Sequence, residues 1–335
     1  MKSELSFSIC MPVYNGACVI GPTLRSIFSQ SFTNYELIIT DDCSKDGIEK
    51  VVKDFRDERV KFFKNQKNLG YSLNLEECRK KAKNEIIFLM GQDDILAQGS
   101  LLKIENIFSA NEDIGAVTRA YFWFDESIKK PVRLKLPLES NKDEVLTVDS
   151  PQKDLLRMFS SLDQLSGLAY RRKFLDIGFH KDIFPCHVYP FMSILKRHPI
   201  VFLKDYTIAV RIGTSQTRKI SSIYDESPVQ SWVEMFKTVF FEKKFSEQRD
   251  FWIRNFVATN YVGLVQIRNY GRYRYLLREI FYLLKYRWEN LFNFQFWFFS
   301  LGCIIMPPFA LTHLVDWYKN RIMSQSFKQI KFNYK

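Results

Sequence analysis

The stretch EIIFLMGQDDIL, residues 85–96, decides how the rest of this chain is organised. Its apolar run from Ile86 to Met90 has the length and the β-branched content of a buried strand. A Gly-Gln-Asp-Asp turn at residues 91–94 follows directly, and two adjacent carboxylates there are unfavourable unless a cation or a polar ligand compensates them. In an open α/β sheet this position is the crevice in which ligands bind, whereas the alternative is a solvated turn whose acids begin a helix.

Length and composition allow one large domain with an extension, or two domains, because the chain has 335 residues and 46% hydrophobic residues. A net charge of +12 combined with 31 Phe, 16 Tyr and 6 Trp suits a membrane surface, nucleic acid or a phosphate-bearing ligand. The six cysteines show no C-x-x-C spacing, which indicates reduced thiols in a reducing compartment. The first residues lack a long apolar segment, so we predict no signal peptide.

Strand and helix patterns alternate along the first part of the chain. Apolar runs at Phe7 to Val13, Tyr35 to Thr40 and Ile86 to Met90 predict buried strands, Val60 to Lys64 predicts a further strand, and helical spacing lies between them. Such alternation is typical of βαβ units, in which a crossover helix joins parallel strands. The predicted fold class is therefore α/β, with a mainly parallel central sheet flanked by helices.

Three of these strands end in polar clusters, which are Tyr14-Asn15, Asp41-Asp42 and Asp93-Asp94. Parallel strands bring their carboxyl ends to one edge of a sheet, so we expect the three clusters to meet there. Their convergence predicts a pocket for a polar, phosphorylated ligand with a cation beside it. No G-x-G-x-x-G motif follows the first strand and no P-loop pattern is present, which disfavours a dinucleotide-type Rossmann site.

The motifs ICMPVYNGACVIGPTLRSIFSQSFTNYELIITDDCSKDG, KNLGYSLN and IIFLMGQDDIL, in this order, resemble those of the family 2 glycosyltransferases. The resemblance covers roughly residues 6–215 and is strongest to about residue 105. It implies the Rossmann-like GT-A fold, a nucleotide-sugar donor and transfer of the sugar with inversion.

The resemblance also implies which residues bind the donor. Asp42 matches the acid that contacts the base, with Asp41 beside it, and Asp93 matches the second acid of the D-x-D motif, the metal ligand. The nucleotide-sugar-binding residues implied in the motifs are Pro12, Val13, Tyr14, Asn15, Asp41, Asp42, Asn68, Gly70, Asn74, Gln92 and Asp93.

The metal-binding motif departs from the family pattern, because the usual D-S-D-D reads Gly91-Gln92-Asp93-Asp94 here. Gly91 replaces the first acid, so one carboxylate is absent. Asp93 can still hold Mg²⁺ or Mn²⁺, since such hard cations keep several waters and often take only one or two protein carboxylates. The ion would neutralise the leaving diphosphate of the donor. Asp94 is either a second metal ligand or a helix N-terminal acid.

The catalytic base of the family is also missing from its usual place. The family carries a Glu-Asp pair where this chain reads DIGFHKDIFPCHVYPFMSIL, residues 176–195. An inverting transfer needs a base to take the proton of the acceptor hydroxyl, and His187 is the first candidate because histidine titrates near neutral pH. Asp182 is the second candidate, and a structural or phosphate-contacting His187 is the alternative. Both departures resemble the abequosyltransferase-like branch, which transfers dideoxy sugars in O-antigen assembly.

The second half of the predicted catalytic domain is less regular. Residues 125–150 are charged and contain two prolines, so we expect an excursion from the core near the acceptor. Residues 201–212 predict one or two further strands, and the polar loop after them contains Arg218. Arg218 is a candidate for contact with the donor diphosphate, with a solvated basic loop as the alternative.

The character of the chain changes near Ser227, and we expect a catalytic domain over residues 1–222 and a helical C-terminal region over residues 223–335. Residues 268–288 combine six Arg or Lys with Tyr, Phe and Leu, which resembles a basic amphipathic helix on an anionic membrane surface. The alternative is a helix packed on the catalytic domain with a solvated basic face.

Residues 291–315 contain no Asp, Glu, Lys or Arg, and a segment of that length could span a bilayer. The Pro307-Pro308 pair frees backbone groups that lipid cannot satisfy, so we prefer a helix lying within one leaflet. A single span and a buried helix of a soluble protein are the alternatives. Basic residues after this segment favour the cytoplasmic side.

These features predict a metal-assisted glycosyltransferase that adds one sugar to a lipid-linked saccharide acceptor in O-antigen-type or capsule-type polysaccharide biosynthesis. We expect it at the cytoplasmic face of the inner membrane, as a peripheral or monotopic protein. The alternative is a catalytically degenerate GT-A-like binding or scaffold protein at the membrane. Nucleic-acid binding is disfavoured, because the basic C-terminal third is rich in Phe and Leu and carries no base-reading motif.

Overall fold

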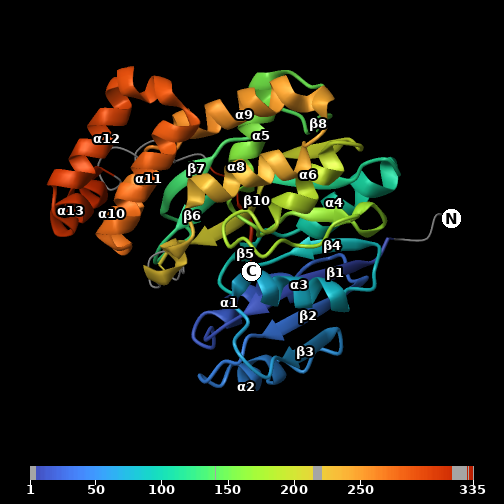
Figure 1. The fold of residues 1–335 in the computed structure, drawn as a ribbon. Helices are drawn as coiled ribbons and strands as arrows, with labels where there is room; N and C mark the ends of the chain where they lie inside the picture. The colour runs from blue at the N-terminus through green and yellow to red at the C-terminus, as the bar shows by residue number, and fades with distance from the viewer. Residues whose placement is uncertain (1–4, 140, 214–220, 319–329, 331, 335) are drawn as a thin grey trace. The chain divides into compact units, whose positions relative to one another are not determined.

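The computed structural model describes residues 5–139, 141–213, 221–318, 330 and 332–334 (Figure 1). It divides into two compact units. The first unit, which we call the catalytic unit after the predicted catalytic domain, comprises Met1–Lys181, Cys186–Arg211 and Gln329–Lys335, and the helical unit comprises Asp182–Pro185 and Ile212–Lys328. Arg218, predicted to contact the donor, lies outside the described residues.

Among the residues that the structure describes, the catalytic unit contains a ten-stranded sheet and six α-helices. The strands are β1 (Phe7–Val13), β2 (Tyr35–Asp41), β3 (Val60–Lys64), β4 (Ile86–Leu89), β5 (Ile95–Leu96), β6 (Ala116–Phe124), β7 (Pro131–Lys135), β8 (Glu144–Leu146), β9 (Ala169–Arg171) and β10 (Ile200–Arg211). The helices are α1 (Ile20–Phe28), α2 (Ile48–Lys53), α3 (Tyr71–Lys81), α4 (Ser100–Ala110), α5 (Gln152–Ser160) and α6 (Val188–Leu195), with short 3-10 turns η1 (Ser161–Asp163) and η2 (Arg172–Phe174).

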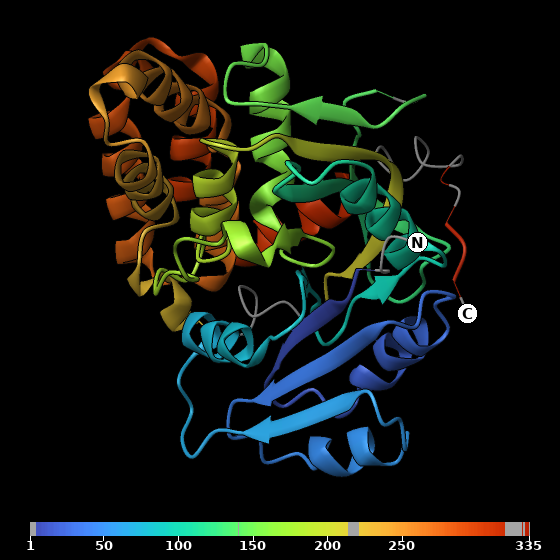
Figure 2. The ribbon, with the colours of Figure 1, turned by 90° about the vertical axis from the view of Figure 1, so that its right-hand side faces the viewer.

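The four N-terminal strands form the parallel sheet that the alternation predicts. They lie in the order β3-β2-β1-β4, and each neighbouring pair is parallel (Figure 2). Every residue of β1, β2 and β4 is buried, as the continuous apolar runs predict for strands covered on both faces. Helix α3 packs on β1 and β2, and α1 packs against α2 and β5.

The sheet as a whole is mixed, so the prediction of a mainly parallel sheet holds for only part of it. Strand β9 pairs antiparallel with both β4 and β6, and β5 pairs antiparallel with β10. The expected excursion at residues 125–150 returns to this sheet, because β7 pairs antiparallel with β6 and β8 with β10. The link between β6 and β7 is too short for the crossover that a parallel pair requires.

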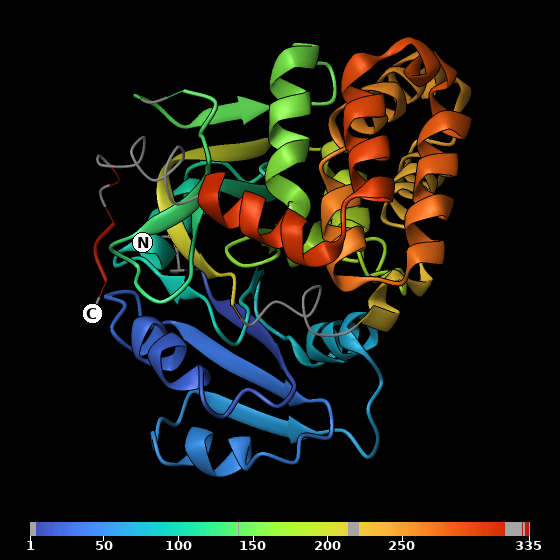
Figure 3. The same cartoon turned by 90° about the vertical axis from the view of Figure 1, so that its left-hand side faces the viewer.

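The helical unit consists of packed helices and 3-10 turns (Figure 3). They are η3 (Ser221–Asp225), α8 (Pro228–Val239), η4 (Lys243–Phe245), α9 (Ser246–Thr259), α10 (Gly263–Tyr270), α11 (Tyr273–Tyr286), η5 (Trp288–Phe292), α12 (Phe294–Ile305) and α13 (Pro308–Tyr318). Aromatic side chains form much of its core: the ring of the fully buried Trp252 contacts Phe236 and Phe240. Glu279 of α11 fixes the start of α8, since it accepts hydrogen bonds from the Ser227 hydroxyl and from the Val229 amide.

The apolar segment at residues 291–315 does not form one continuous helix. Helix α12 ends at Ile305 and α13 begins at Pro308, so the break falls at the proline pair. Within the part of the chain that the structure describes, no helix has both the length and the apolar character needed to cross a membrane.

Candidate functional site

The three polar clusters meet at one edge of the catalytic unit. Strand β1 lies between β2 and β4 and is parallel to both, so their carboxyl ends point the same way. The Asp42 amide donates to the carbonyl of Val13 at 2.9 Å, which continues the pairing past the strand ends. Pro12 and Val13, both predicted to bind the donor, are the last two residues of β1 and are buried.

Gln92 joins the ends of β1 and β4. Its Oε1 accepts the Tyr14 amide at 2.9 Å, and its Nε2 donates to the Tyr14 carbonyl at 3.2 Å. A Cβ on Gly16 would lie only 2.3 Å from Gln92 Oε1, so the close approach of this side chain requires glycine there. The amide that we predicted to contact the donor is therefore engaged with the backbone of Tyr14, and it fixes the conformation of this turn.

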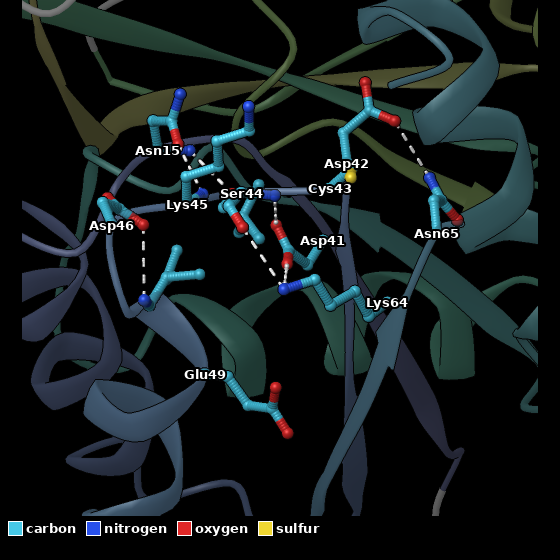
Figure 4. Close-up of polar contacts among 12 residues, drawn as sticks. Asn15, Asp41, Asp42, Cys43, Ser44, Lys45, Asp46, Glu49, Lys64 and Asn65 are labelled. Carbon is cyan, nitrogen blue, oxygen red and sulfur yellow. Dashed lines mark hydrogen bonds and ion pairs between the residues drawn. The ribbon is translucent and has the colours of Figure 1, made fainter. Parts of the chain in front are cut away.

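The Asp42 carboxylate organises the segment before α3. Its Oδ1 accepts from the Leu69 amide at 2.7 Å and from Asn65 Nδ2 at 3.0 Å, and its Oδ2 accepts from the Gly70 amide at 2.9 Å (Figure 4 shows the Asn65 contact). Hydrogen bonds to a carboxylate are stronger than neutral ones, so this side chain holds the loop close to the end of β2. Asn68 adds a local bond, because its Oδ1 accepts from the Gly70 amide at 3.0 Å.

Asp41 is buried beside Asp42 and has a different set of contacts. Its Oδ1 accepts from the Ser44 amide at 3.0 Å, and its Oδ2 lies 3.7 Å from Lys64 Nζ (Figure 4). That Oδ2 is buried and has no hydrogen-bond partner among the described residues. A buried carboxylate oxygen without a hydrogen bond is energetically unfavourable, so the hydrogen-bonding capacity of the polar groups at this edge is not fully used.

Two loop residues at this edge have left-handed backbone conformations that non-glycine residues seldom adopt: φ is 46° at Asn15 and 64° at Cys43. The loops hold each other, because the Asn15 amide donates to Ser44 Oγ at 2.8 Å and Asn15 Oδ1 accepts from the Lys45 amide at 3.0 Å (Figure 4). Strained backbone kept in place by its surroundings clusters at functional sites.

Asn74 acts from the first turns of α3. Its Nδ2 donates to the Thr40 carbonyl at 2.9 Å, and its Oδ1 accepts from Asn65 Nδ2 at 2.9 Å. The side chain is buried, and its hydrogen bonds join α3 to the end of β2. Asn74 therefore shapes the edge of the sheet, as Asp42 does.

The Asp93-Asp94 pair lies where β4 gives way to β5, and its two carboxylates differ in environment. Asp94 is 2% exposed and accepts hydrogen bonds from Ser166 Oγ and from the Arg211 amide. Burial, and then the neighbouring charge of Asp93, raise the pKa of Asp94 to about 8. Asp94 precedes a strand, so the expectation of a helix N-terminal acid is wrong, and its engaged oxygens make it a poor candidate for a metal ligand.

Gly91 belongs to the same arrangement. Its amide donates to Ser166 Oγ at 2.8 Å. A Cβ on Gly91 would lie 2.9 Å from Asp94 Oδ2 and 3.1 Å from Ser166 Oγ, which is closer than ordinary van der Waals contact. The first acid of the D-x-D motif therefore cannot be accommodated here unless Ser166 or Asp94 moves.

A divalent cation at this corner would rely on Asp93, which is partly buried. Among the described residues, no group of three or more His, Cys, Asp or Glu side chains could hold a metal by itself. One carboxylate fits Mg²⁺ or Mn²⁺ only where diphosphate oxygens and waters supply the other ligands, a coordination that these ions commonly adopt.

Sequence reasoning missed Ser44, Ser166 and Arg211, which hold the site together. Arg211 Nε donates to the Asp93 carbonyl at 3.4 Å, and its guanidinium lies 4.7 Å from the ring centre of Phe124. Arg211 is the last residue of β10, so only its position at a strand end could have drawn attention to it. Ser44 and Ser166 lie in loops, and each forms a hydrogen bond with a residue that is distant in sequence.

The two candidate bases are placed differently. His187 is 3% exposed, its Nε2 lies 2.8 Å from the Leu162 carbonyl, and its own carbonyl accepts from the Tyr170 hydroxyl. Burial lowers the pKa of His187 to about 4, although the Leu162 contact opposes this shift. This environment favours the structural alternative for His187. Asp182 is partly buried and belongs to the helical unit.

Comparison with known proteins gives a family match over residues 8–177, about half of the chain, to "Glycosyl transferase family 2". The chain is 29% identical over 129 residues to the putative glycosyltransferase EpsE of Bacillus subtilis, a region that covers 38% of this chain and 46% of the relative. It is 33% identical over 88 residues to the UDP-Glc:alpha-D-GlcNAc-diphosphoundecaprenol beta-1,3-glucosyltransferase WfgD of Escherichia coli, covering 26% and 35%. The chain thus spans less than half the length of these curated relatives.

Solved structures share the fold at low sequence identity. S. aureus TarS 1-349, in complex with UDP-GlcNAc, matches with a TM-score of 0.64 and 13% identity over 99% of this chain and 97% of that chain. The mannosyltransferase PcManGT from Pyrobaculum calidifontis, in complex with GDP-Man and Mn²⁺, matches with a TM-score of 0.55 and 14% identity over 91% and 87%. The GT-A-like fold expected from the sequence is thereby confirmed.

Proposed function

Because the chain belongs to glycosyl transferase family 2, we propose that it is a glycosyltransferase that transfers one sugar from a nucleotide-sugar donor to a lipid-linked saccharide. The observation that carries this proposal is the meeting of three polar strand ends, from β1, β2 and β4, within the catalytic unit. A nucleoside diphosphate needs hydrogen-bond acceptors for its base and ribose and positive charge beside its phosphates. Carboxylate and amide oxygens lie at this edge, and Asp93 would hold the cation that compensates the phosphates.

The donor would lie across these strand ends. The loops held by Asp41 and Asp42 supply a buried, polar surface for the base and ribose. Asp93 defines the diphosphate end. Structures of TarS contain UDP and UDP-GlcNAc, and that of PcManGT contains GDP-Man with Mn²⁺, which supports a diphosphate-linked donor without specifying its base.

We infer that Asp93 holds a Mg²⁺ or Mn²⁺ ion when the donor is bound. Bound to the diphosphate, the ion would neutralise the charge that develops on the leaving group. The residues of this chain keep the corner rigid: Ser166 and the Arg211 amide restrain Asp94, and Arg211 Nε holds the Asp93 carbonyl. Asp94 supports the corner, and Asp93 would hold the ion.

Transfer would proceed with inversion. The acceptor hydroxyl attacks the anomeric carbon as the bond to the diphosphate breaks, and a base takes the hydroxyl proton. His187 and Asp182 are the candidates from the sequence. The burial of His187 makes direct proton transfer to it difficult, so Asp182 is the stronger candidate.

The acceptor is proposed to be a saccharide on a lipid diphosphate. WfgD and a Campylobacter jejuni glucosyltransferase act, by their names, on sugars linked to diphosphoundecaprenol or PP-undecaprenol. A membrane-bound acceptor would place the reaction at the cytoplasmic face of the inner membrane, in O-antigen-type or capsule-type polysaccharide biosynthesis.

Thermal-shift titration with UDP-, GDP-, CDP- and dTDP-sugars, with and without Mn²⁺, tests the proposal, because a bound donor stabilises the folded state by mass action. We expect one nucleotide to raise the melting temperature, more so with Mn²⁺, and to be hydrolysed slowly. Asp93→Asn should remove the Mn²⁺ effect, whereas Asp113→Asn, at an exposed turn, should not. If no nucleotide binds, the proposal is overturned.

A catalytically degenerate scaffold is the second candidate, because Gly91 replaces an acid and the Glu-Asp pair is absent. It predicts donor binding without hydrolysis or transfer in the presence of Mn²⁺ and membrane lipid extract. Turnover abolished by Asp93→Asn would exclude it.

A further inference from the structure

Helix α12 is apolar on two opposite faces. Its inner face packs into the helical unit through the fully buried Phe296 and Ser300 and through Cys303. Its outer face follows the spacing i, i+3, i+4, i+7, i+11 and consists of Phe294, Trp297, Phe298, Leu301 and Ile305. These outer side chains are exposed, by 82% at Phe294, 64% at Phe298 and 75% at Ile305. A helix on the surface of a water-soluble unit normally carries polar residues there.

The exposed apolar surface extends beyond α12 on both sides in the sequence. Trp288, Leu291 and Phe292 precede the helix, Phe309 follows it, and Phe292 is 81% exposed. Together with the outer face of α12 they make up the aromatic face, defined by Trp288, Leu291, Phe292, Phe294, Trp297, Phe298, Leu301, Ile305 and Phe309. Isolated exposed apolar residues are ordinary, but nine within 22 residues of sequence indicate an interaction surface.

Basic side chains accompany this face. Helix α11 packs against α12 and carries the exposed residues Arg274 and Lys285, and Arg272 is exposed just before it. The same helix exposes Leu277 and Phe281. Exposed aromatic residues on one helix and exposed cations on the helix packed against it match the chemistry of a bilayer interface that contains anionic lipid, with acyl chains for the rings and headgroups for the cations.

We propose that the aromatic face docks the protein on an anionic phospholipid bilayer, with α12 lying in the plane of one leaflet. This deepens the proposed function and rests on it, since a lipid-linked acceptor is reached from a membrane surface. A second copy of the chain fits the face less well, because it would bring the same basic residues of α11 towards each other. An anionic lipid surface complements them instead.

The geometry of α12 favours lying in the membrane over crossing it. At 1.5 Å per residue its 12 residues extend about 18 Å, well short of the roughly 30 Å of a hydrocarbon core. Its C-terminal end is tied to a charge, because Arg268 Nε donates to the Met306 carbonyl at 3.3 Å. Moving that end through the bilayer would also bury a guanidinium in lipid.

Co-sedimentation with vesicles tests the proposal. We expect the full chain to bind vesicles of phosphatidylcholine with about one third phosphatidylglycerol, and to bind pure phosphatidylcholine more weakly. A triple variant, Phe292→Ser, Phe294→Ser and Phe298→Ser, should weaken binding by about tenfold or more. Its folding should be little affected, since all three side chains are largely exposed. Phe241→Ser, at a 70% exposed phenylalanine outside the aromatic face, is the matched control and should bind as the unmodified chain does.

Three results would overturn the proposal: no vesicle binding by the unmodified chain, unchanged binding by the triple variant, or a dimer in light scattering that the triple variant converts to a monomer. Donor binding is measured in parallel by thermal shift. Loss of vesicle binding with an unchanged nucleotide response supports membrane docking. Absence of any nucleotide response in the unmodified chain instead contradicts the proposed function and leaves the vesicle result standing.

Discussion

The hydroxyl of Ser166, in the loop before β9, donates a hydrogen bond to the buried carboxylate of Asp94 and accepts one from the amide of Gly91, which follows the neighbouring strand β4. The pair occupies the space beside Gly91 into which the missing first acid would project. The substitution of that acid is thus accompanied by a packed polar contact, which explains why the corner keeps a defined shape without it.

Restoring the family residue by Gly91→Asp should destabilise the protein. The new Cβ would lie 2.9 Å from Asp94 Oδ2, and overpacking of this kind typically costs about 1–3 kcal/mol. Urea unfolding measures the change in free energy. Gly263→Ala is the control, because a Cβ there meets no atom within 4 Å, and it should leave stability nearly unchanged. Equal stability of both variants would show that the corner rearranges freely.

Asp93 and Asp94 should respond differently to the same substitution. Asp93→Asn should abolish the Mn²⁺-dependent part of donor binding, because it removes the carboxylate proposed to contact the ion. Asp94→Asn keeps the size of a side chain that is buried and hydrogen-bonded, so it should retain most of that dependence. Calorimetric titration of donor with and without Mn²⁺ compares them. If Asp94→Asn abolished the Mn²⁺-dependent part of donor binding and Asp93→Asn retained it, Asp94 would be the metal ligand.

Asp42→Asn should weaken donor binding by about tenfold or more, because an amide cannot accept from both Leu69 and Gly70 as the carboxylate does. The loop before α3 would then lose its attachment to β2. Asp57→Asn, which removes an ion pair with Arg59 in the β2–β3 region, is the control for stability alone. Donor affinity unchanged in Asp42→Asn would contradict this role of the loop.

His187 should make folding depend on pH. Its pKa is lowered to about 4 by burial, so the unfolded chain, with an ordinary value near 6.5, binds the proton more readily. Stability contributed by neutral His187 is complete above about pH 6.5 and is lost as the pH falls towards 4, by on the order of 2 kcal/mol at pH 5. Urea unfolding at pH 7 and at pH 5 measures this loss. Between these pH values the free energy of unfolding should fall less in His187→Gln than in the unmodified chain.

The same variant tests catalysis. A structural His187 predicts that His187→Gln leaves the pH profile of kcat unchanged in shape. If the fall in kcat at low pH disappears in His187→Gln while the free energy of unfolding is unchanged, His187 is the base. Asp182→Asn is measured beside it as the other candidate.

The N-terminal half of the catalytic unit was predictable because its signals are local. Continuous apolar runs predict β1, β2 and β4, and the rule for parallel strands predicts that the polar ends of these three strands converge. Strand β5 has two residues and β9 has three, so neither has a pattern long enough to detect, and their antiparallel pairing depends on distant partners. Hence the mixed character of the sheet was missed.

The candidate site was predictable as a location and less so in its details. A motif identifies residue types, but it does not say towards which partner a carboxylate or amide points. Gln92, which is predicted to contact the donor, forms hydrogen bonds with the backbone of Tyr14, and Asp42 accepts hydrogen bonds from two loop amides. Burial of His187 follows from packing around α6, which no spacing within residues 176–195 reveals.

Because α12 is apolar on both its buried and its exposed face, a shorter and more soluble protein is difficult to make from this chain. Truncation before residue 290 would remove most of the exposed rings, but it would also remove Phe296 and Cys303 from the interior and expose apolar surface on the helices that remain. Solubility engineering therefore has to proceed by exchanging outward side chains one at a time. Shortening the chain would replace one exposed apolar surface with another.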